Sequence, residues 1–290
     1  MEMHKYALSL KQKSLVDGLS HEHKPNSSKK LMGVDVSINS LGMRDDYILA
    51  DSLKYKNKVL VLGSSITMGW GVDYENVFTT LLQNNLNTIQ KEDNYNFINS
   101  GIGNYNTKFE SILFEKNFDL INPDMVILHY YLNDAEIISK KSSNPIIKYS
   151  YFAAFSYLIL QQLIYSSKEY KSLGDYYLNM YNEENQGWID AQNSILSIKD
   201  TCDENNIPFL VLVQPDLHNV SLESEQKKCH NIINTFLESN MIESIDLFEN
   251  YRKYYENNLE DLWVQNDDPH PNKIGHEIIY KELLKYFTNK

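Results

Sequence analysis

The stretch that decides the fold is KVLVLGSSITMGWGV, residues 58–72. Its apolar run VLVL is typical of a strand that is buried on both faces of a sheet. Gly63 ends the run, two serines follow, and apolar residues then return at helical spacing over residues 75–90. Such a strand–turn–helix places its turn at the carboxyl edge of a parallel sheet, where open α/β sheets bind ligands. Ser65 in this turn is therefore a candidate nucleophile.

Two other motifs are excluded for this turn, and a simpler role for its serines stays open. A phosphate-binding loop needs four residues between its glycines and then Gly-Lys, but five residues separate Gly63 from Gly69, and Trp70 follows. The nucleophile elbow Gly-x-Ser-x-Gly fails because position 67 is Thr. The serines could also merely cap the helix that follows.

Composition limits the classes of function. The chain has 290 residues, 42% of them hydrophobic, which is enough for one large domain or two small ones. Its formal net charge of −12 opposes binding to nucleic acid. Cys202 and Cys229 have no metal-type spacing and are predicted to be free thiols in a reducing compartment. The N-terminal sequence lacks the pattern of a signal peptide, so a cytoplasmic protein is expected.

The N-terminal residues 1–31 are polar and are predicted to form a loosely packed arm. Its histidines have no partners at the spacing of metal ligands, so no metal site is expected there; they are His4, His21 and His23. Apolar residues alternate over 34–38, which indicates a short exposed strand outside the main sheet. The charged residues that follow are expected to form a surface ion-pair cluster of Arg44, Asp45 and Asp46.

The rest of the chain alternates strands and helices, which predicts a parallel sheet with helical crossovers. The predicted strands are 58–63, 96–100, 124–130, 208–213 and 244–248. The predicted helices are 75–90, 109–118, 187–206, 222–240 and 277–287. We therefore expect a three-layer α/β/α sandwich with a flavodoxin-like five-stranded parallel sheet, formed by residues 32–290 as a single domain.

A helical insertion is expected at about 137–186, after the third strand. Its centre, residues 149–165, carries no charge and is at the short limit for a membrane span. Serine and glutamine residues within it favour a lid over the active edge rather than contact with a membrane. The aromatic stretch 176–188 either walls a substrate pocket or packs in the core, and core packing is favoured.

Polar residues follow several of the predicted strands at the same edge of the sheet. The loop 101–107 contains Gly-x-Gly but lacks the third glycine of a dinucleotide fingerprint. Near the C-terminus, two prolines fix the backbone around His270, and Asp267 lies three residues before it. A histidine oriented by a carboxylate is what a general base requires. A metal site formed with His276 remains an alternative, although the spacing is not that of HExxH.

Taken together, these motifs resemble those of the SGNH/GDSL hydrolases. The resemblance rests on GSSIT at 63–67, NSGIGNYNT at 99–107, LND at 132–134 and DDPHPNKIGH at 267–276, and INSLGMRDD at 38–46 resembles a common lead-in. Ser64 stands where the family usually has aspartate. The resemblance implies a catalytic triad of Ser65, Asp267 and His270. It also implies an oxyanion hole formed by the Ser65 N–H, the backbone of Gly103 or Asn104, and the Asn133 side chain.

The implied activity is hydrolysis of a small acyl ester, with acetyl favoured, of a carbohydrate or related metabolite, through an acyl-enzyme and without a metal or cofactor. A lipase- or thioesterase-like hydrolase, or an acyltransferase acting on a longer-chain or lipid-linked substrate, stays open. A catalytically silent binding module is the alternative outside enzymology. The expected partner is a small-molecule ester that can belong to a glycan.

Overall fold

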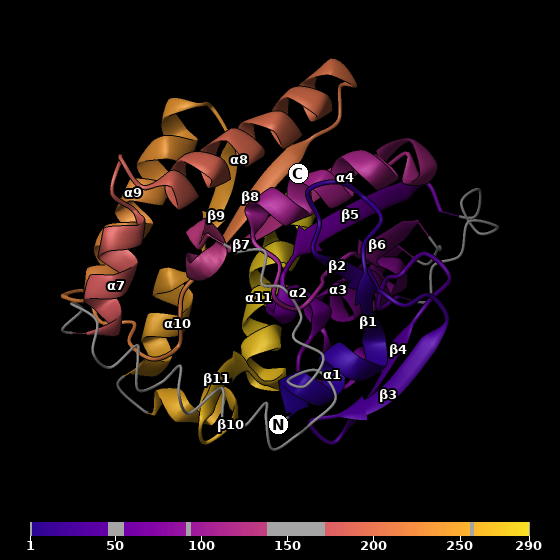
Figure 1. Cartoon of the computed structure of the whole chain (residues 1–290), viewed down its shortest axis with the longest axis horizontal. Helices are drawn as coiled ribbons and strands as arrows, with labels where there is room; N and C mark the ends of the chain where they lie inside the picture. The colour runs from indigo at the N-terminus through magenta and orange to yellow at the C-terminus, as the bar shows by residue number, and fades with distance from the viewer. Residues whose placement is uncertain (1, 46–54, 91–93, 138–171, 256–257, 290) are drawn as a thin grey trace.

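The computed structural model describes residues 2–45, 55–90, 94–137, 172–255 and 258–289. Its centre is a five-stranded parallel sheet with strand order β6-β5-β7-β8-β9, which confirms the predicted sheet (Figure 1). The strands are β5 (Asn57–Gly63), β6 (Tyr95–Asn99), β7 (Met125–Tyr131), β8 (Phe209–Gln214) and β9 (Glu243–Asp246).

Helices cover both faces of this sheet and make it the middle layer of an α/β/α sandwich. The helices against one face are α4 (Thr107–Ile121), α7 (Leu173–Met180), α8 (Gln186–Glu204) and α9 (Glu225–Ser239). Those against the other face are α3 (Phe78–Gln90), α10 (Phe248–Tyr255) and α11 (Lys273–Thr288). In β5, Leu60 and Leu62 pack on the first face, and Val59 and Val61 pack on the second. This alternation is the period of two that a strand dictates, and burial on both faces explains the uninterrupted apolar run.

The N-terminal residues are packed against the domain, and the prediction of a loose arm is wrong. They form α1 (Glu2–Leu10), β1 (Lys11–Lys13), β2 (His21–His23), β3 (Ser27–Leu31) and β4 (Val34–Ile38). β1 pairs with β2, and β3 with β4, in two antiparallel hairpins outside the main sheet. Tyr6 and Leu10 of α1 are fully buried in a cluster that also contains Met68 and Trp70. The helix α1 therefore contacts the segment that follows the candidate nucleophile.

The predicted lid or membrane-contacting segment 149–165 lies outside the described residues. Within the ranges described, no helix is long and apolar enough to cross a membrane. The aromatic residues 176–188 are largely core residues, since Tyr177, Tyr181 and Trp188 are buried.

A third small hairpin, near the C-terminus, was not predicted from the sequence. It consists of β10 (Trp263–Gln265) and β11 (Asp268–Pro271), preceded by the 3-10 turn η4 (Leu259–Leu262). The hairpin joins β9 and α10 to the C-terminal helix α11, and it carries His270.

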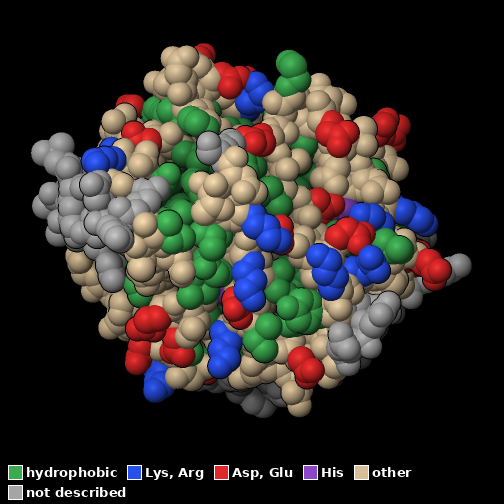
Figure 2. Space-filling view, turned by 180° about the vertical axis from the view of Figure 1, so that it is seen from behind, with side chains coloured by type: hydrophobic (Ala, Val, Ile, Leu, Met, Phe, Trp, Pro, Cys, Tyr) green, Lys and Arg blue, Asp and Glu red, His purple; other side chains and the backbone are tan. Residues whose placement is uncertain are grey.

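The surface carries charges of both signs. On the face shown in Figure 2, Lys and Arg side chains are interspersed with Asp and Glu, and hydrophobic side chains lie between them. Mixed charges of this kind are ordinary for the surface of a folded domain.

Candidate active site

The candidate nucleophile, Ser65, is the first residue of the short helix α2 (Ser65–Met68), which follows β5 directly. A Cβ at Gly63 would lie 2.0 Å from Thr67 Oγ1, so the sharp turn into α2 requires glycine there. The Thr67 hydroxyl in turn hydrogen-bonds His129 Nδ1 of β7 at 2.9 Å. As the first residue of a helix, Ser65 has a backbone N–H with no acceptor inside that helix.

The C-terminal end of α2 is bound by Arg44, and the prediction that Arg44 belongs to a surface ion-pair cluster is wrong. Arg44 is 1% exposed, and its guanidinium donates to the carbonyl oxygens of Met68 (3.0 Å), Gly69 (2.6 Å) and Val72 (2.8 Å). A cation at the C-terminal end of a helix satisfies carbonyl groups that the helix leaves unpaired. Asp45 is also buried, and Asp46 lies outside the described residues. Arg44 thereby fixes the helix that begins at Ser65.

The loop after β6 is tied to the same helix. The Asn99 side-chain amide donates to Thr67 O at 2.7 Å, and the Asn99 backbone N–H donates to Asp45 Oδ2 at 2.8 Å. A Cβ at Gly101 would lie 2.2 Å from Met68 N, so only glycine permits this close approach of loop and helix. The loops after β5 and β6 are therefore fixed relative to one another.

Ser65 and His270 are in hydrogen-bond contact. Ser65 Oγ lies 2.8 Å from His270 Nε2, although the two residues are 205 positions apart in the chain. His270 belongs to β11, and its side chain is 26% exposed. This contact is the geometry by which a neutral imidazole accepts the proton of an attacking serine.

The carboxylate that orients His270 is Asp268, not the predicted Asp267. Asp268 Oδ1 lies 2.5 Å from His270 Nδ1 and also accepts the His270 backbone N–H at 3.2 Å. Asp267 is exposed and precedes β11. Side chains two positions apart lie on the same face of a strand, whereas adjacent ones face opposite ways. Asp268 and His270 therefore share a face that Asp267 does not.

A second donor holds the Asp268 carboxylate. The indole N–H of the buried Trp70 donates to Asp268 Oδ2 at 3.0 Å. Burial raises the pKa of Asp268, but the hydrogen bonds from His270 and Trp70 outweigh it, and the pKa lies below its usual value. Asp268 is therefore ionised at neutral pH and has its two oxygens committed to defined donors.

The structure distinguishes between the two backbone donors predicted for the oxyanion hole. The Gly103 N–H already donates to the Tyr6 hydroxyl at 3.0 Å. Asn104 is exposed and has a left-handed φ of 66°, which Asn tolerates better than most residues. The Asn104 N–H is therefore the better candidate donor at this loop.

The peptide group that carries the Asn104 N–H is bound on its other side by the N-terminal hairpin. The carbonyl oxygen of this peptide belongs to Gly103, and it accepts a hydrogen bond from Lys11 Nζ at 2.6 Å. His21 Nε2 lies 3.1 Å from the same oxygen, and Lys11 also donates to Asn104 Oδ1 at 2.7 Å. Donors on a carbonyl polarise the peptide and strengthen its N–H as a donor. Burial lowers the pKa of Lys11 to about 7.

Asn133, the third predicted oxyanion donor, follows β7 in the 3-10 turn η3 (Leu132–Ala135). Its Oδ1 is buried without a hydrogen-bond partner in the part of the chain that the structure describes. The strand order places β7 next to β5, so η3 and α2 follow neighbouring strands at the same edge of the sheet. The Asn133 Oδ1 is thus uncommitted, and Asn133 lies in the turn beside the strand that leads to Ser65.

The alternative metal site at His276 is not supported by the geometry. His276 is 1% exposed, lies in the helix α11, and its Nδ1 accepts the Phe78 backbone N–H at 3.3 Å. Among the described residues, no group of three or more His, Cys, Asp or Glu side chains is placed to hold a metal ion.

Several site residues were not identified from the sequence: Tyr6, Lys11, Trp70 and Asp268. One signal was available for Asp268, because the sequence Asp-Asp-Pro-His places a second aspartate two positions before His270. The residues of the N-terminal hairpin carry no pattern that would connect them to a loop more than 80 positions away.

Comparison with solved structures identifies the fold. An acetyl xylan esterase, AlAXEase, matches with a TM-score of 0.50 and 22% identity over 79% of this chain and 98% of the other. A mutant of Axe2, an acetyl-xylooligosaccharide esterase from Geobacillus Stearmophilus, matches with a TM-score of 0.53 and 13% identity over 80% and 94%. A two-domain esterase active on acetylated mannans matches with a TM-score of 0.50 and 14% identity over 83% and 50%.

The chain therefore shares the fold of these three esterases, and its central five-stranded parallel sheet is the one that the sequence predicted. No protein-family model and no curated protein matches the sequence.

Proposed function

We propose that the protein is a serine esterase that hydrolyses a small acyl ester, acetyl in the first place, of a carbohydrate or related metabolite. The observation that carries this proposal is the continuous hydrogen-bonded chain from Ser65 through His270 to Asp268, with distances of 2.8 and 2.5 Å. A serine that merely caps a helix would have no reason to contact an imidazole that is itself held by a partly buried carboxylate.

In the acylation step, Ser65 Oγ attacks the ester carbonyl while His270 Nε2 takes its proton. Asp268 keeps the Nδ1 proton of His270 in place and stabilises the imidazolium that forms. The Ser65 N–H, the Asn104 N–H and the Asn133 amide bind the negative charge that develops on the carbonyl oxygen. The imidazolium then protonates the leaving alkoxide.

In the second step, water attacks the acyl-enzyme. His270 removes a proton from the water and returns it to Ser65 Oγ as the acid product leaves. Every proton in this cycle passes through His270 Nε2, so the residues of this chain complete the reaction by themselves.

The choice of a sugar acetate rests on the structural neighbours, three of which act on acetylated xylan, xylo-oligosaccharides or mannans. Their identities of 13–22% to this chain establish a shared fold. The substrate class goes beyond that shared fold and is the most specific part of the proposal.

The test is hydrolysis of p-nitrophenyl acetate and p-nitrophenyl octanoate by the wild type and by Ser65→Ala. We expect Ser65→Ala to lose about 10⁴-fold or more in turnover, and the acetate to be preferred to the octanoate. A fluorophosphonate should label the wild type at Ser65 and leave Ser65→Ala unlabelled. A folded wild type that reacts with neither ester and is not labelled would refute the proposal and leave a binding role.

A further inference from the structure

A second Asp-x-His pair repeats the arrangement that orients His270. In both pairs, one carboxylate oxygen of the aspartate accepts the backbone N–H of the histidine and contacts its Nδ1. The distances are 2.8 and 2.6 Å for Asp216 with His218, against 3.2 and 2.5 Å for Asp268 with His270. In the second pair, too, Nδ1 is held by a carboxylate while Nε2 faces away from it.

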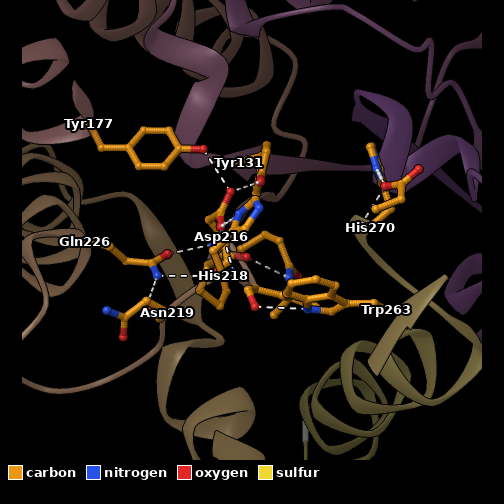
Figure 3. Close-up of polar contacts among 12 residues, drawn as sticks. Tyr131, Tyr177, Asp216, His218, Asn219, Gln226, Trp263 and His270 are labelled. Carbon is orange, nitrogen blue, oxygen red and sulfur yellow. Dashed lines mark hydrogen bonds and ion pairs between the residues drawn. The ribbon is translucent and has the colours of Figure 1, made fainter. Parts of the chain in front are cut away.

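The Asp216 carboxylate is held more firmly than a surface ion pair would need. Its other oxygen, Oδ2, accepts the hydroxyls of Tyr131 at 2.6 Å and Tyr177 at 2.9 Å (Figure 3). The Gln226 side chain binds both the backbone N–H and the carbonyl of Asp216. Burying an ionised carboxylate is costly unless it is fully hydrogen-bonded, and here two tyrosine hydroxyls supply the bonds. The result is one imidazole held in a single orientation, with Nδ1 towards the carboxylate.

His218 is open to a ligand. Its side chain is 46% exposed, and its Nε2 has no hydrogen-bond partner among the residues that the structure describes. The hydrogen bond to Asp216 raises the pKa of His218 above its usual value. A third pair differs, because His230, 2.8 Å from Asp246, is 0% exposed and unreachable from solvent. Exposure therefore distinguishes His218 from a purely structural histidine.

The position of His218 relates it to the catalytic centre. Asp216 and His218 follow β8, at the same edge of the sheet as the nucleophile turn after β5. One strand lies between β5 and β8, so the two strands themselves lie about 10 Å apart. The ring of Trp263 packs edge-on against His218 with centroids 5.5 Å apart, and Trp263 pairs with Pro271 in the hairpin that carries His270 (Figure 3).

We propose that His218, oriented by Asp216 and flanked by Trp263, is a subsite for the alcohol part of the ester, where Nε2 binds a hydroxyl group of the substrate. This inference rests on the proposed esterase function and makes it more specific. A ligand that binds at both sites needs an ester group at one end and a free hydroxyl group elsewhere in its alcohol part. A partly acetylated sugar has both. The net charge of −12 favours a neutral sugar over an anionic one.

The test compares substrates that do and do not carry hydroxyl groups. The panel consists of mono-O-acetylated methyl xyloside, glucoside and mannoside, and p-nitrophenyl acetate is the reference. The measured quantity is the ratio of kcat/KM for each sugar acetate to kcat/KM for p-nitrophenyl acetate. His218→Phe removes the hydrogen bond and retains an aromatic ring beside Trp263. His218→Gln retains a side chain that can accept and donate a hydrogen bond.

We expect the wild type to prefer at least one sugar acetate and His218→Phe to lower that ratio about tenfold, which is the usual effect of one lost hydrogen bond. His218→Gln should recover part of the ratio. The control is Leu222→Ala, at an exposed position in the segment that follows, which should not change it.

Two results would overturn the inference: a wild type that prefers none of the sugar acetates, or a ratio that His218→Phe leaves unchanged, whether neither kind of substrate loses activity or both lose it equally. A wild type that shows no Ser65-dependent hydrolysis of any of these esters would instead refute the proposed esterase function. The ester assays therefore distinguish failure of the subsite from failure of the proposed function.

Discussion

Exchanging the carboxylate of Asp268 for an amide should disable His270 while leaving its ring in place. Three donors converge on the two carboxylate oxygens: the Nδ1 and backbone N–H of His270 on Oδ1, and the Trp70 indole on Oδ2. Asn offers only one oxygen, so in Asp268→Asn an N–H group must face either Trp70 or His270. When it faces His270, the imidazole proton moves to Nε2, which can then no longer accept the proton of Ser65.

The lower bound of the effect is the loss of a hydrogen bond to a charged group, about 1.5–3 kcal/mol, or roughly 10- to 150-fold. The upper bound is the loss of the reactive tautomer, which costs about 10⁴-fold, or about 5.5 kcal/mol, in triads of this kind. We therefore expect kcat for p-nitrophenyl acetate to fall by roughly 10²–10⁴-fold, with a smaller effect on KM.

The matched control is the neighbouring substitution Asp267→Asn, which changes the same charge one position away at an exposed residue. It should change kcat less than about twofold, because a solvated charge that contacts no reacting group has little effect on the chemistry. The assay is p-nitrophenol release, and thermal unfolding of both variants verifies that they are folded. Activity lost in Asp267→Asn but retained in Asp268→Asn would refute the assignment of Asp268. It would show that Asp267, three residues before His270, orients the imidazole.

Three further predictions concern the oxyanion hole and the buried charges around it. Asn133→Ala should lower kcat by about 10²–10³-fold with a smaller change in KM, since one donor to the oxyanion is lost. Lys11→Met should lower kcat about tenfold because the Gly103 carbonyl loses a charged donor. Because burial places the pKa of Lys11 near 7, wild-type kcat should decline as pH rises through about 7 while Lys11→Arg retains its rate. Glu110→Gln should stabilise the protein at pH 8 by roughly 1–3 kcal/mol, because both Glu110 carboxylate oxygens are buried without partners.

Each of these predictions has its own contrary outcome. Full activity in Asn133→Ala would remove that residue from the oxyanion hole. If the pH profile of kcat is the same in Lys11→Arg as in the wild type, the charge of Lys11 does not act on the reaction through the Gly103 carbonyl. For Glu110, burial and the neighbouring Asp134 carboxylate raise the pKa well above its usual value. Stability should therefore fall as pH rises from the unfolded pKa towards this raised value, and Glu110→Gln should flatten that decline in urea unfolding. A decline of equal slope in both proteins would exclude this origin.

The main sheet could be predicted from the sequence because its strands are buried on both faces. Short apolar runs such as residues 59–62, when they alternate with amphipathic helices, are characteristic of the central strands of a parallel sheet. The N-terminal segment could not be predicted in the same way. Its strands β1 and β2 have three residues each, and its buried anchors Tyr6 and Leu10 belong to a helix of only nine residues. Short elements of this kind depend on tertiary contacts that local patterns do not encode.

The same limit applies within the candidate site. Ser65 and His270 follow from motifs, but the choice between Asp267 and Asp268 depends on which face of β11 each side chain occupies. The sequence shows two adjacent aspartates and does not fix where the strand begins. The choice between Gly103 and Asn104 likewise depends on the Tyr6 hydroxyl, which reaches the loop from 97 positions away.

The separation of 205 positions between Ser65 and His270 has a consequence for biosynthesis. A nascent chain that has emerged as far as η3 already contains the candidate nucleophile Ser65 and Asn133, but it lacks His270. We therefore expect the serine to stay unreactive until the hairpin β10–β11 has been translated and has docked beside it. A fluorophosphonate that reacts only with the activated Ser65 would thus report, in a crude translation mixture, the moment at which tertiary assembly is finished.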